Sequence, residues 1–222
     1  MEKPIDEQMI CFITAVTDRK EYMRSLATWQ KLRVPDGMKV QYIAAAIGRD
    51  SSVGRAYRLL MAKSSARYKI YIRQDVEIAE EGFLEKAVAI FKEHSEYGIA
   101  GAAGSISLPD SAIWYEGDIA GCIYDDHQGS MQGYRFQKDT AEAALPVMLL
   151  DGCILMTSMD VAFSDGFCDK EELYAASMCM AFRKQGLEAV AWSSLGEGIR
   201  QRISSLISSY YIMPINISAS LP

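Results

Sequence analysis

Residues 9–16 form an almost unbroken apolar run, Met-Ile-Cys-Phe-Ile-Thr-Ala-Val, and this run limits the possible folds more than any other part of the chain. A strand with one solvent-facing side alternates apolar and polar residues, whereas an uninterrupted apolar strand is typical of a sheet that is covered on both faces. Such sheets are mostly parallel, because helical crossovers lie on both of their faces. We therefore expect a helix-covered sheet with this run as one of its buried strands.

Helical and strand patterns alternate along the rest of the chain. Helices are expected over 21–32, 51–61, 82–94 and 170–185. Further strands are expected over 40–47, 68–73, 99–103, 146–157 and 187–192. This order predicts an α/β fold with a mostly parallel mixed sheet flanked by helices, and residues 105–144 predict loops with short antiparallel pieces.

One domain is expected over residues 1–196, and residues 197–222 form a separate C-terminal segment. Apolar side chains recur at helical spacing in that segment, at Ile199, Ile203 and Leu206. The spacing predicts an amphipathic helix that packs on the domain or on a partner subunit. The second arrangement would make the protein a homo-oligomer.

Composition argues against several classes of protein. The 222 residues carry a formal net charge of -6 and no basic run, so no nucleic-acid-binding surface is predicted. The longest apolar run, residues 145–156, contains Asp151 and is too short for a transmembrane segment. The five cysteines form no Cys-x-x-Cys pair, which indicates reduced thiols and a cytoplasmic location.

The strand expected over 68–73 is followed at once by a carboxylate, Asp75. In open α/β sheets, ligands bind outside the carboxyl ends of the strands. An acid at that position suits a divalent cation that carries a phosphorylated substrate. The alternative is that Asp75 only turns or caps the chain, as aspartate often does.

Several stretches, taken in order, resemble one known family. They are the strand 10–17 with its polar loop, the helix start 52–58, the strand 68–76, the strand 150–156 and the helix end 182–186. Their order and spacing resemble nucleotide-sugar glycosyltransferases of the A-type fold, in the broad family 2 group, and within it a glycosyltransferase-like branch.

The resemblance implies transfer of a sugar from a UDP- or GDP-linked donor to a hydroxyl of a glycan or lipid-linked acceptor, in polysaccharide or glycan assembly. It places Thr14, Thr17 and Asp18 along the nucleotide, although Asp18 is equally typical of a turn. Asp75 would be the last acid of the metal-binding Asp-x-Asp motif, and the implied cofactor is Mn²⁺ or Mg²⁺. Arg73 replaces the first acid, where it contacts the diphosphate or repels the metal.

An inverting transferase also needs a base that deprotonates the acceptor hydroxyl. The family's acid in the last core helix falls near Ala175, which cannot accept a proton. The candidates left are Asp151, Glu171 and Glu172. Asp151 alternatively binds backbone amides and shapes a turn, and the two glutamates alternatively form a solvated first helical turn.

Two functions therefore stay open. The first is an active glycosyltransferase of the hexosyltransferase type, which the order of strands and loops favours. The second is a catalytically inactive glycosyltransferase-like module that binds a nucleotide sugar, a glycan or a protein partner, which Arg73 and Ala175 favour. A nucleotidyltransferase on a similar sheet would need a glycine-rich basic loop, and residues 17–20, Thr-Asp-Arg-Lys, contain no glycine.

Overall fold

The structure is a computed structural model of the whole chain. It describes residues 4–48, 51–108, 110, 116–127, 130–135, 143–164, 173–193 and 199–202. The helices are α1 (Arg19–Trp29), α2 (Val53–Met61), α3 (Phe83–Glu93) and α4 (Leu173–Lys184). The strands of the larger sheet are β1 (Asp6–Val16), β2 (Lys39–Ala46), β3 (Ala66–Ile72), β5 (Tyr97–Gly101), β9 (Ala144–Val147), β11 (Ile154–Thr157) and β12 (Glu188–Trp192).

The larger sheet has seven strands in the order β2-β1-β3-β11-β5-β12-β9. The pairs β1–β2, β1–β3 and β5–β12 are parallel, whereas β11 and β9 run antiparallel to their neighbours. The expected α/β fold with a mostly parallel mixed sheet is therefore confirmed. β11 is inserted between β3 and β5, and this insertion places the turn before β11 next to the residues that follow β3.

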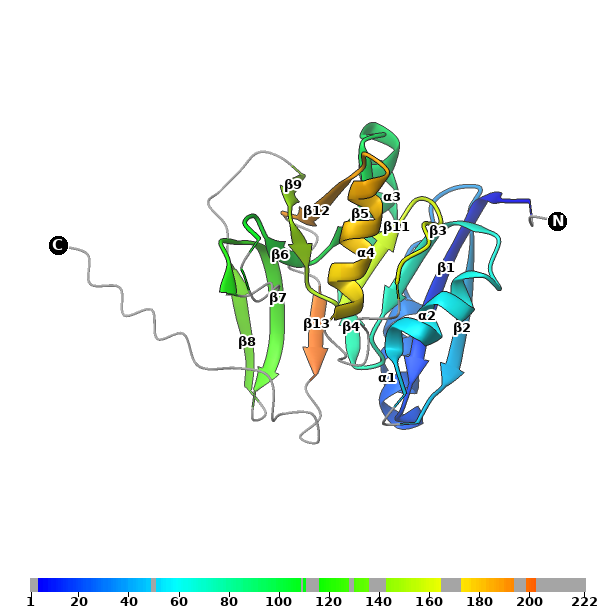
Figure 1. Cartoon of the computed structure of the whole chain (residues 1–222). Coiled ribbons are helices and arrows are strands. Elements are labelled where there is room, and N and C mark those ends of the chain that lie inside the picture. Colours follow the sequence, from blue (N-terminus) through cyan, green and yellow to red (C-terminus); the bar gives the residue numbers. More distant parts are fainter. Residues whose placement is uncertain are drawn as a thin grey trace.

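Helices cover both faces of the larger sheet (Figure 1). One core joins α1 and α3 to strand residues such as Phe12, Ile70 and Trp192. The other core joins α2 and α4 to strand residues such as Ile13 and Tyr71. Because neighbouring residues of β1 belong to opposite cores, both faces of this strand are apolar, which explains the unbroken run in the sequence.

A second sheet stands beside the first, with the order β10-β6-β7-β13-β4 and β8 paired to β7. Its strands are β4 (Val76–Ile78), β6 (Ala103–Ser105), β7 (Ile119–His127), β8 (Ser130–Arg135), β10 (Leu149–Leu150) and β13 (Ile199–Arg202). In Figure 1 the β7–β8 hairpin lies on the opposite side of the molecule from β2. The antiparallel strands expected over 105–144 are present as β7 and β8, and β7, with 9 residues, is longer than the short pieces that were expected.

Two expected elements are different in the structure. The single strand expected over 146–157 is divided into β9, β10 and β11. β9 pairs with β12 in the larger sheet, β10 pairs with β6 in the second sheet, and a turn at Asp151 and Gly152 separates β10 from β11. The amphipathic helix expected over 198–211 does not begin at Ile199, because residues 199–202 form β13 between β4 and β7. Pairing with two distant strands and complete burial of Ile199 outweigh a local helical period. The remainder of that segment lies outside the described residues.

Four of the five cysteines fall in the described ranges, and all four are buried and outside disulfides: Cys11, Cys122, Cys153 and Cys179. Burial raises the pKa of Cys153 well above that of an ordinary thiol, and the neighbouring Asp151 raises it further. Among the helices that the structure describes, none is long and apolar enough to cross a membrane.

Candidate functional site

The topology brings two buried acids, Asp75 and Asp151, to one edge of the larger sheet. β1 and β3 are parallel, so their carboxyl ends lie at the same edge. β11 runs in the opposite direction, and its first residue, Ile154, pairs with the last residue of β3, Ile72. The Arg73 backbone N–H also donates to the Cys153 carbonyl oxygen at 3.0 Å. The turn at Asp151 therefore lies against the residues that follow β3.

Arg73 and Asp75 form a two-bond ion pair directly after β3. The Arg73 Nε donates to Asp75 Oδ1 at 3.1 Å, and Nη2 donates to Oδ2 at 3.0 Å. This side-by-side geometry is the strongest arrangement that arginine and a carboxylate adopt. The Asp75 side chain is only 4% exposed, whereas the Arg73 side chain is 21% exposed. The accessible part of the pair is therefore the cation.

Asp151 lies in the turn before β11 and is 5% exposed. Its Oδ1 accepts from the Cys153 backbone N–H at 2.6 Å, so the expected role in shaping the turn is present. Burial raises the pKa of Asp151, and the bond from Cys153 and the charge of Arg73 oppose this rise. Asp75 adds to the rise through like charge. A buried acid with a raised pKa is a candidate proton acceptor near neutral pH.

Gln74 connects the loop after β1 to the end of β3. Its Oε1 accepts from the backbone N–H groups of Thr17 and Asp18 at 2.8 and 2.9 Å, and its Nε2 donates to Thr17 Oγ1 at 2.8 Å. Thr17 and Asp18 are exposed, so a ligand can approach them. Asp18 is also the N-cap of α1, with Oδ1 accepting from Lys20 and Glu21. The alternative role of Asp18 as a local turn and cap residue is thus seen directly.

We predict that Gln74→Leu weakens the nucleotide binding that the family resemblance implies by about 5- to 30-fold, because two loop N–H groups lose their acceptor and the loop loosens. Gln185→Leu, the same change at an exposed position after α4, is the matched control. Calorimetric titration with UDP and GDP measures the effect. Equal binding by Gln74→Leu and the wild type would show that the loop conformation does not depend on Gln74.

The other residues that the sequence analysis considered for the site are either buried or outside the described residues. Thr14 lies within β1 and is 1% exposed, so its side chain belongs to the sheet interior and not to an accessible surface. Ala175 is also buried, at 1% exposure in the core under α4. Glu171 and Glu172 lie outside the described residues, and the described part of α4 begins at Leu173.

Two tyrosines beneath this edge were not among the predicted site residues. The rings of Tyr57 in α2 and Tyr174 in α4 pack edge to face, with centroids 5.2 Å apart. The Tyr174 hydroxyl donates to the Gly152 carbonyl oxygen, which holds the turn that carries Asp151. Burial raises the pKa of Tyr57, while Arg73 lowers it and Asp75 raises it. In the sequence, Tyr57 was connected to the site only because it lies in the helix start 52–58 that resembles the family. No feature of the sequence pointed to Tyr174.

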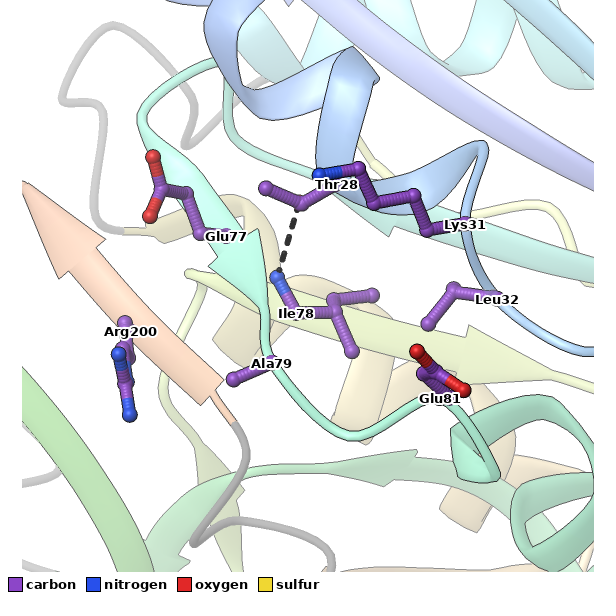
Figure 2. Close-up of a pocket in the computed structure, with 8 residues that line it drawn as sticks. All are labelled: Thr28, Lys31, Leu32, Glu77, Ile78, Ala79, Glu81 and Arg200. Carbon is purple, nitrogen blue, oxygen red and sulfur yellow. Dashed lines mark hydrogen bonds between the residues drawn. The ribbon is translucent and has the colours of Figure 1, made fainter.

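α1 fixes the short strand β4, which begins directly after Asp75. The Trp29 indole N–H donates to the Val76 carbonyl oxygen at 2.9 Å, and the Ile78 N–H donates to Thr28 Oγ1 at 3.2 Å. Figure 2 shows the second bond, from β4 to the C-terminal turn of α1. Asp75 is thus held between β3 on one side and an anchored β4 on the other.

A pocket of about 240 Å³ lies between α1, β4 and β13 (Figure 2). Its lining contains two cations and two acids, Lys31, Arg200, Glu77 and Glu81. None of the predicted site residues lines it. Its volume is below the range of about 300–1,000 Å³ that is usual for small-molecule sites, so it does not suit a nucleotide sugar.

The residues around Asp75 do not fit a divalent cation well. Both carboxylate oxygens are bonded to Arg73, and a metal held at about 2.1 Å from either oxygen would lie next to a guanidinium of like charge. The acid that would share the metal is replaced by this same arginine. Among the residues that the structure describes, no group of three histidine, cysteine, aspartate or glutamate side chains could hold a metal ion.

The mostly parallel sheet with helices on both faces has the glycosyltransferase A-type fold, as its similarity to a solved glycosyltransferase shows. A mannosyltransferase from Pyrobaculum calidifontis, PcManGT, solved in complex with GDP-Man and Mn²⁺, is similar with a TM-score of 0.55 at 8% identity. The match covers 94% of this chain and 62% of the mannosyltransferase chain. A197 from STIV matches with a TM-score of 0.46 at 12% identity, over 84% of this chain and 82% of the other.

The chain belongs to the glycosyltransferase-like family, whose model matches residues 11–194. The suspected resemblance is thereby confirmed over most of the chain. No curated protein matches the sequence.

Proposed function

We propose that the protein transfers a sugar from a nucleoside diphosphate sugar to a hydroxyl group of a glycan or lipid-linked acceptor. The donor would bind at the carboxyl edge formed by the ends of β1 and β3 and the turn before β11. The observation that carries this proposal is the meeting of a partly exposed cation, Arg73, and a buried acid, Asp151, at that edge. Membership of the glycosyltransferase-like family supports the reaction class.

In the proposed reaction the acceptor oxygen attacks the anomeric carbon of the donor sugar. The bond from that carbon to the diphosphate oxygen breaks, and its electron pair leaves with the nucleoside diphosphate. Asp151, in its ionised form, takes the proton from the acceptor hydroxyl. Arg73 lies where it would balance the negative charge that develops on the leaving diphosphate.

Thr17 and Asp18 would contact the nucleotide from the loop that Gln74 fixes, because both are exposed at the same edge. The nucleotide of the proposed donor is UDP or GDP, and GDP-linked sugars are tested first because PcManGT was solved with GDP-Man. A divalent cation at Asp75 stays a prediction that the Mn²⁺ in PcManGT supports and the Arg73 bonds oppose.

The proposal is tested by incubating the protein with GDP- and UDP-linked sugars and measuring the released nucleoside diphosphate, with and without oligosaccharide acceptors. Donor binding is followed separately by thermal denaturation. A ligand at 100 times its Kd stabilises the folded protein by about 2.7 kcal/mol, which raises the Tm measurably. Stabilisation together with acceptor-dependent release is the expected result.

If a donor stabilises the protein but no nucleoside diphosphate is released under any condition, the inactive module is favoured. The observation that supports this second function is the buried Ala175, which stands where the family resemblance places an acid. If neither stabilisation nor release occurs with any donor, the proposed function is wrong.

A further inference from the structure

The residues that follow β3 carry a fixed organic cation, Arg73, at the position where the family resemblance implies a metal. We infer that the Arg73 guanidinium takes the place of the divalent cation, so that the donor diphosphate binds without metal. This inference rests on the proposed function, because it concerns how the same donor site holds its ligand.

The first argument is the state of the Asp75 carboxylate. A metal ligand must offer an oxygen lone pair towards the ion. Both oxygens of Asp75 instead accept charge-assisted bonds from Arg73, at 3.1 and 3.0 Å. The side chain is 4% exposed, so an ion arriving from solvent meets the guanidinium before the carboxylate. Asp75 thus acts as the anchor of a cation and not as the ligand of one.

The second argument is the rigidity of the arrangement. The Arg73 backbone is bonded to Cys153, and the guanidinium is held through two bonds in one plane. Asp75 is followed by β4, which Trp29 fixes through the Val76 carbonyl oxygen. A cation that is fixed in advance loses little conformational entropy when its ligand binds.

The third argument is chemical. A guanidinium remains charged at all accessible pH values and presents planar N–H donors that match the oxygens of a phosphate. The two bonds to Asp75 use one edge of that plane, and 21% of the side chain is exposed. The diphosphate of a nucleotide sugar provides oxygens of the required charge and spacing.

The experiment is a calorimetric titration of the full chain with GDP and with UDP, in EDTA and then in Mn²⁺ or Mg²⁺. The wild type is expected to bind one of the two nucleotides equally tightly in EDTA and in metal. Arg73→Gln should weaken binding in EDTA by about 10- to 100-fold, the usual loss for a charge-assisted bond. Arg33→Gln is the matched control, because Arg33 forms an exposed ion pair with Glu85 away from the site.

A second variant tests the substitution of metal by arginine directly. Arg73→Asp restores an acid on either side of Gln74, and we expect it to bind nucleotide in Mn²⁺ but not in EDTA. Because Arg73→Gln leaves Asp75 buried without its partner, the double variant Arg73→Gln/Asp75→Asn is titrated in parallel. It should lose binding in EDTA while melting cooperatively, which separates lost binding from lost folding.

The outcomes distinguish this inference from the proposed function. Nucleotide binding by the wild type only in the presence of metal would overturn the inference and leave the donor site intact. Undiminished binding in EDTA by the double variant would also overturn it. Absence of nucleotide binding in every condition would overturn the proposed function itself, and the inference with it.

Discussion

Turnover of an Asp151→Asn variant is expected to fall by about 10²- to 10⁴-fold, the usual contribution of a positioned general base. Asparagine keeps the oxygen that accepts from the Cys153 N–H, so the turn before β11 should persist. Donor binding and Tm should therefore change little. Release of nucleoside diphosphate at saturating donor measures turnover, and calorimetry measures donor binding.

This variant separates the two roles of Asp151. If Asp151 only shapes the turn, asparagine should leave turnover unchanged. If Asp151 is the base, turnover should fall, because an amide cannot take up the proton. Unchanged turnover would leave Asp151 with its structural role and would direct attention to Glu171 and Glu172. Asp36→Asn, in an exposed turn, is the control for the same chemical change at a distant position.

The pH dependence of turnover should carry the same information. Burial raises the pKa of Asp151, so the ionised base disappears as the pH falls through a value above that of an ordinary aspartate. Turnover should fall on that acid limb, and Asp151→Asn should lack the limb. The stability of the folded protein depends on pH in the opposite direction. The raised pKa of Asp151 contributes stability that is fully present below the pKa of this group in the unfolded chain, and the contribution is lost as the pH rises through the pKa in the folded protein.

Replacing Trp29 with alanine is expected to lower the free energy of unfolding by about 3–5 kcal/mol. Trp29 is 1% exposed and stacks on Phe12 with ring centroids 5.5 Å apart. Its indole N–H also satisfies the Val76 carbonyl oxygen, which would be left without that donor. In a domain of this size the Tm should fall by about 2–4 °C for each kcal/mol. Thermal and urea denaturation measure the change.

Trp29→Phe separates packing from the hydrogen bond. Phenylalanine retains most of the stacking on Phe12 but cannot donate to Val76, so a loss of about 1–3 kcal/mol is expected. Leu59→Ala is the control, because Leu59 is 58% exposed and should change stability by less than about 0.5 kcal/mol. A Trp29→Ala variant as stable as the Leu59→Ala control would contradict the role of Trp29 as the anchor of β4.

Local patterns in the sequence were sufficient for the elements that lie wholly in the two cores. The run at residues 9–16 predicted β1, and the helix expected over 51–61 is α2, which Ser52 caps by accepting from the Arg55 N–H. These features depend on neighbouring residues only, because hydrophobic period and capping are set within one or two turns or strand repeats. The family resemblance rested on the same local elements in their order.

The site depends on pairings between distant residues, which no local pattern contains. The insertion of β11 between β3 and β5 brings Asp151 towards Asp75, and the register of Ile154 with Ile72 sets how closely they approach. Likewise, pairing with β4 and β7 makes a strand of residues 199–202, although their apolar spacing is helical. Strand order is decided by which faces and edges can be buried together across the whole fold.

The sequence by itself determined the α/β class, the family and the residues Arg73, Asp75 and Asp151 as candidates. Only the tertiary structure decided that Arg73 is bonded to both oxygens of Asp75 and that Gln74 ties the loop after β1 to the end of β3. The physical reason is that side-chain direction after a strand end depends on the partners available there. Arg73 finds its side-chain partner two residues away, in Asp75, whereas Gln74 bonds the loop after β1 and the Arg73 backbone bonds Cys153 before β11. Those two segments lie far from residues 73–75 along the chain but next to them in the fold, because β1 and β11 both pair with β3.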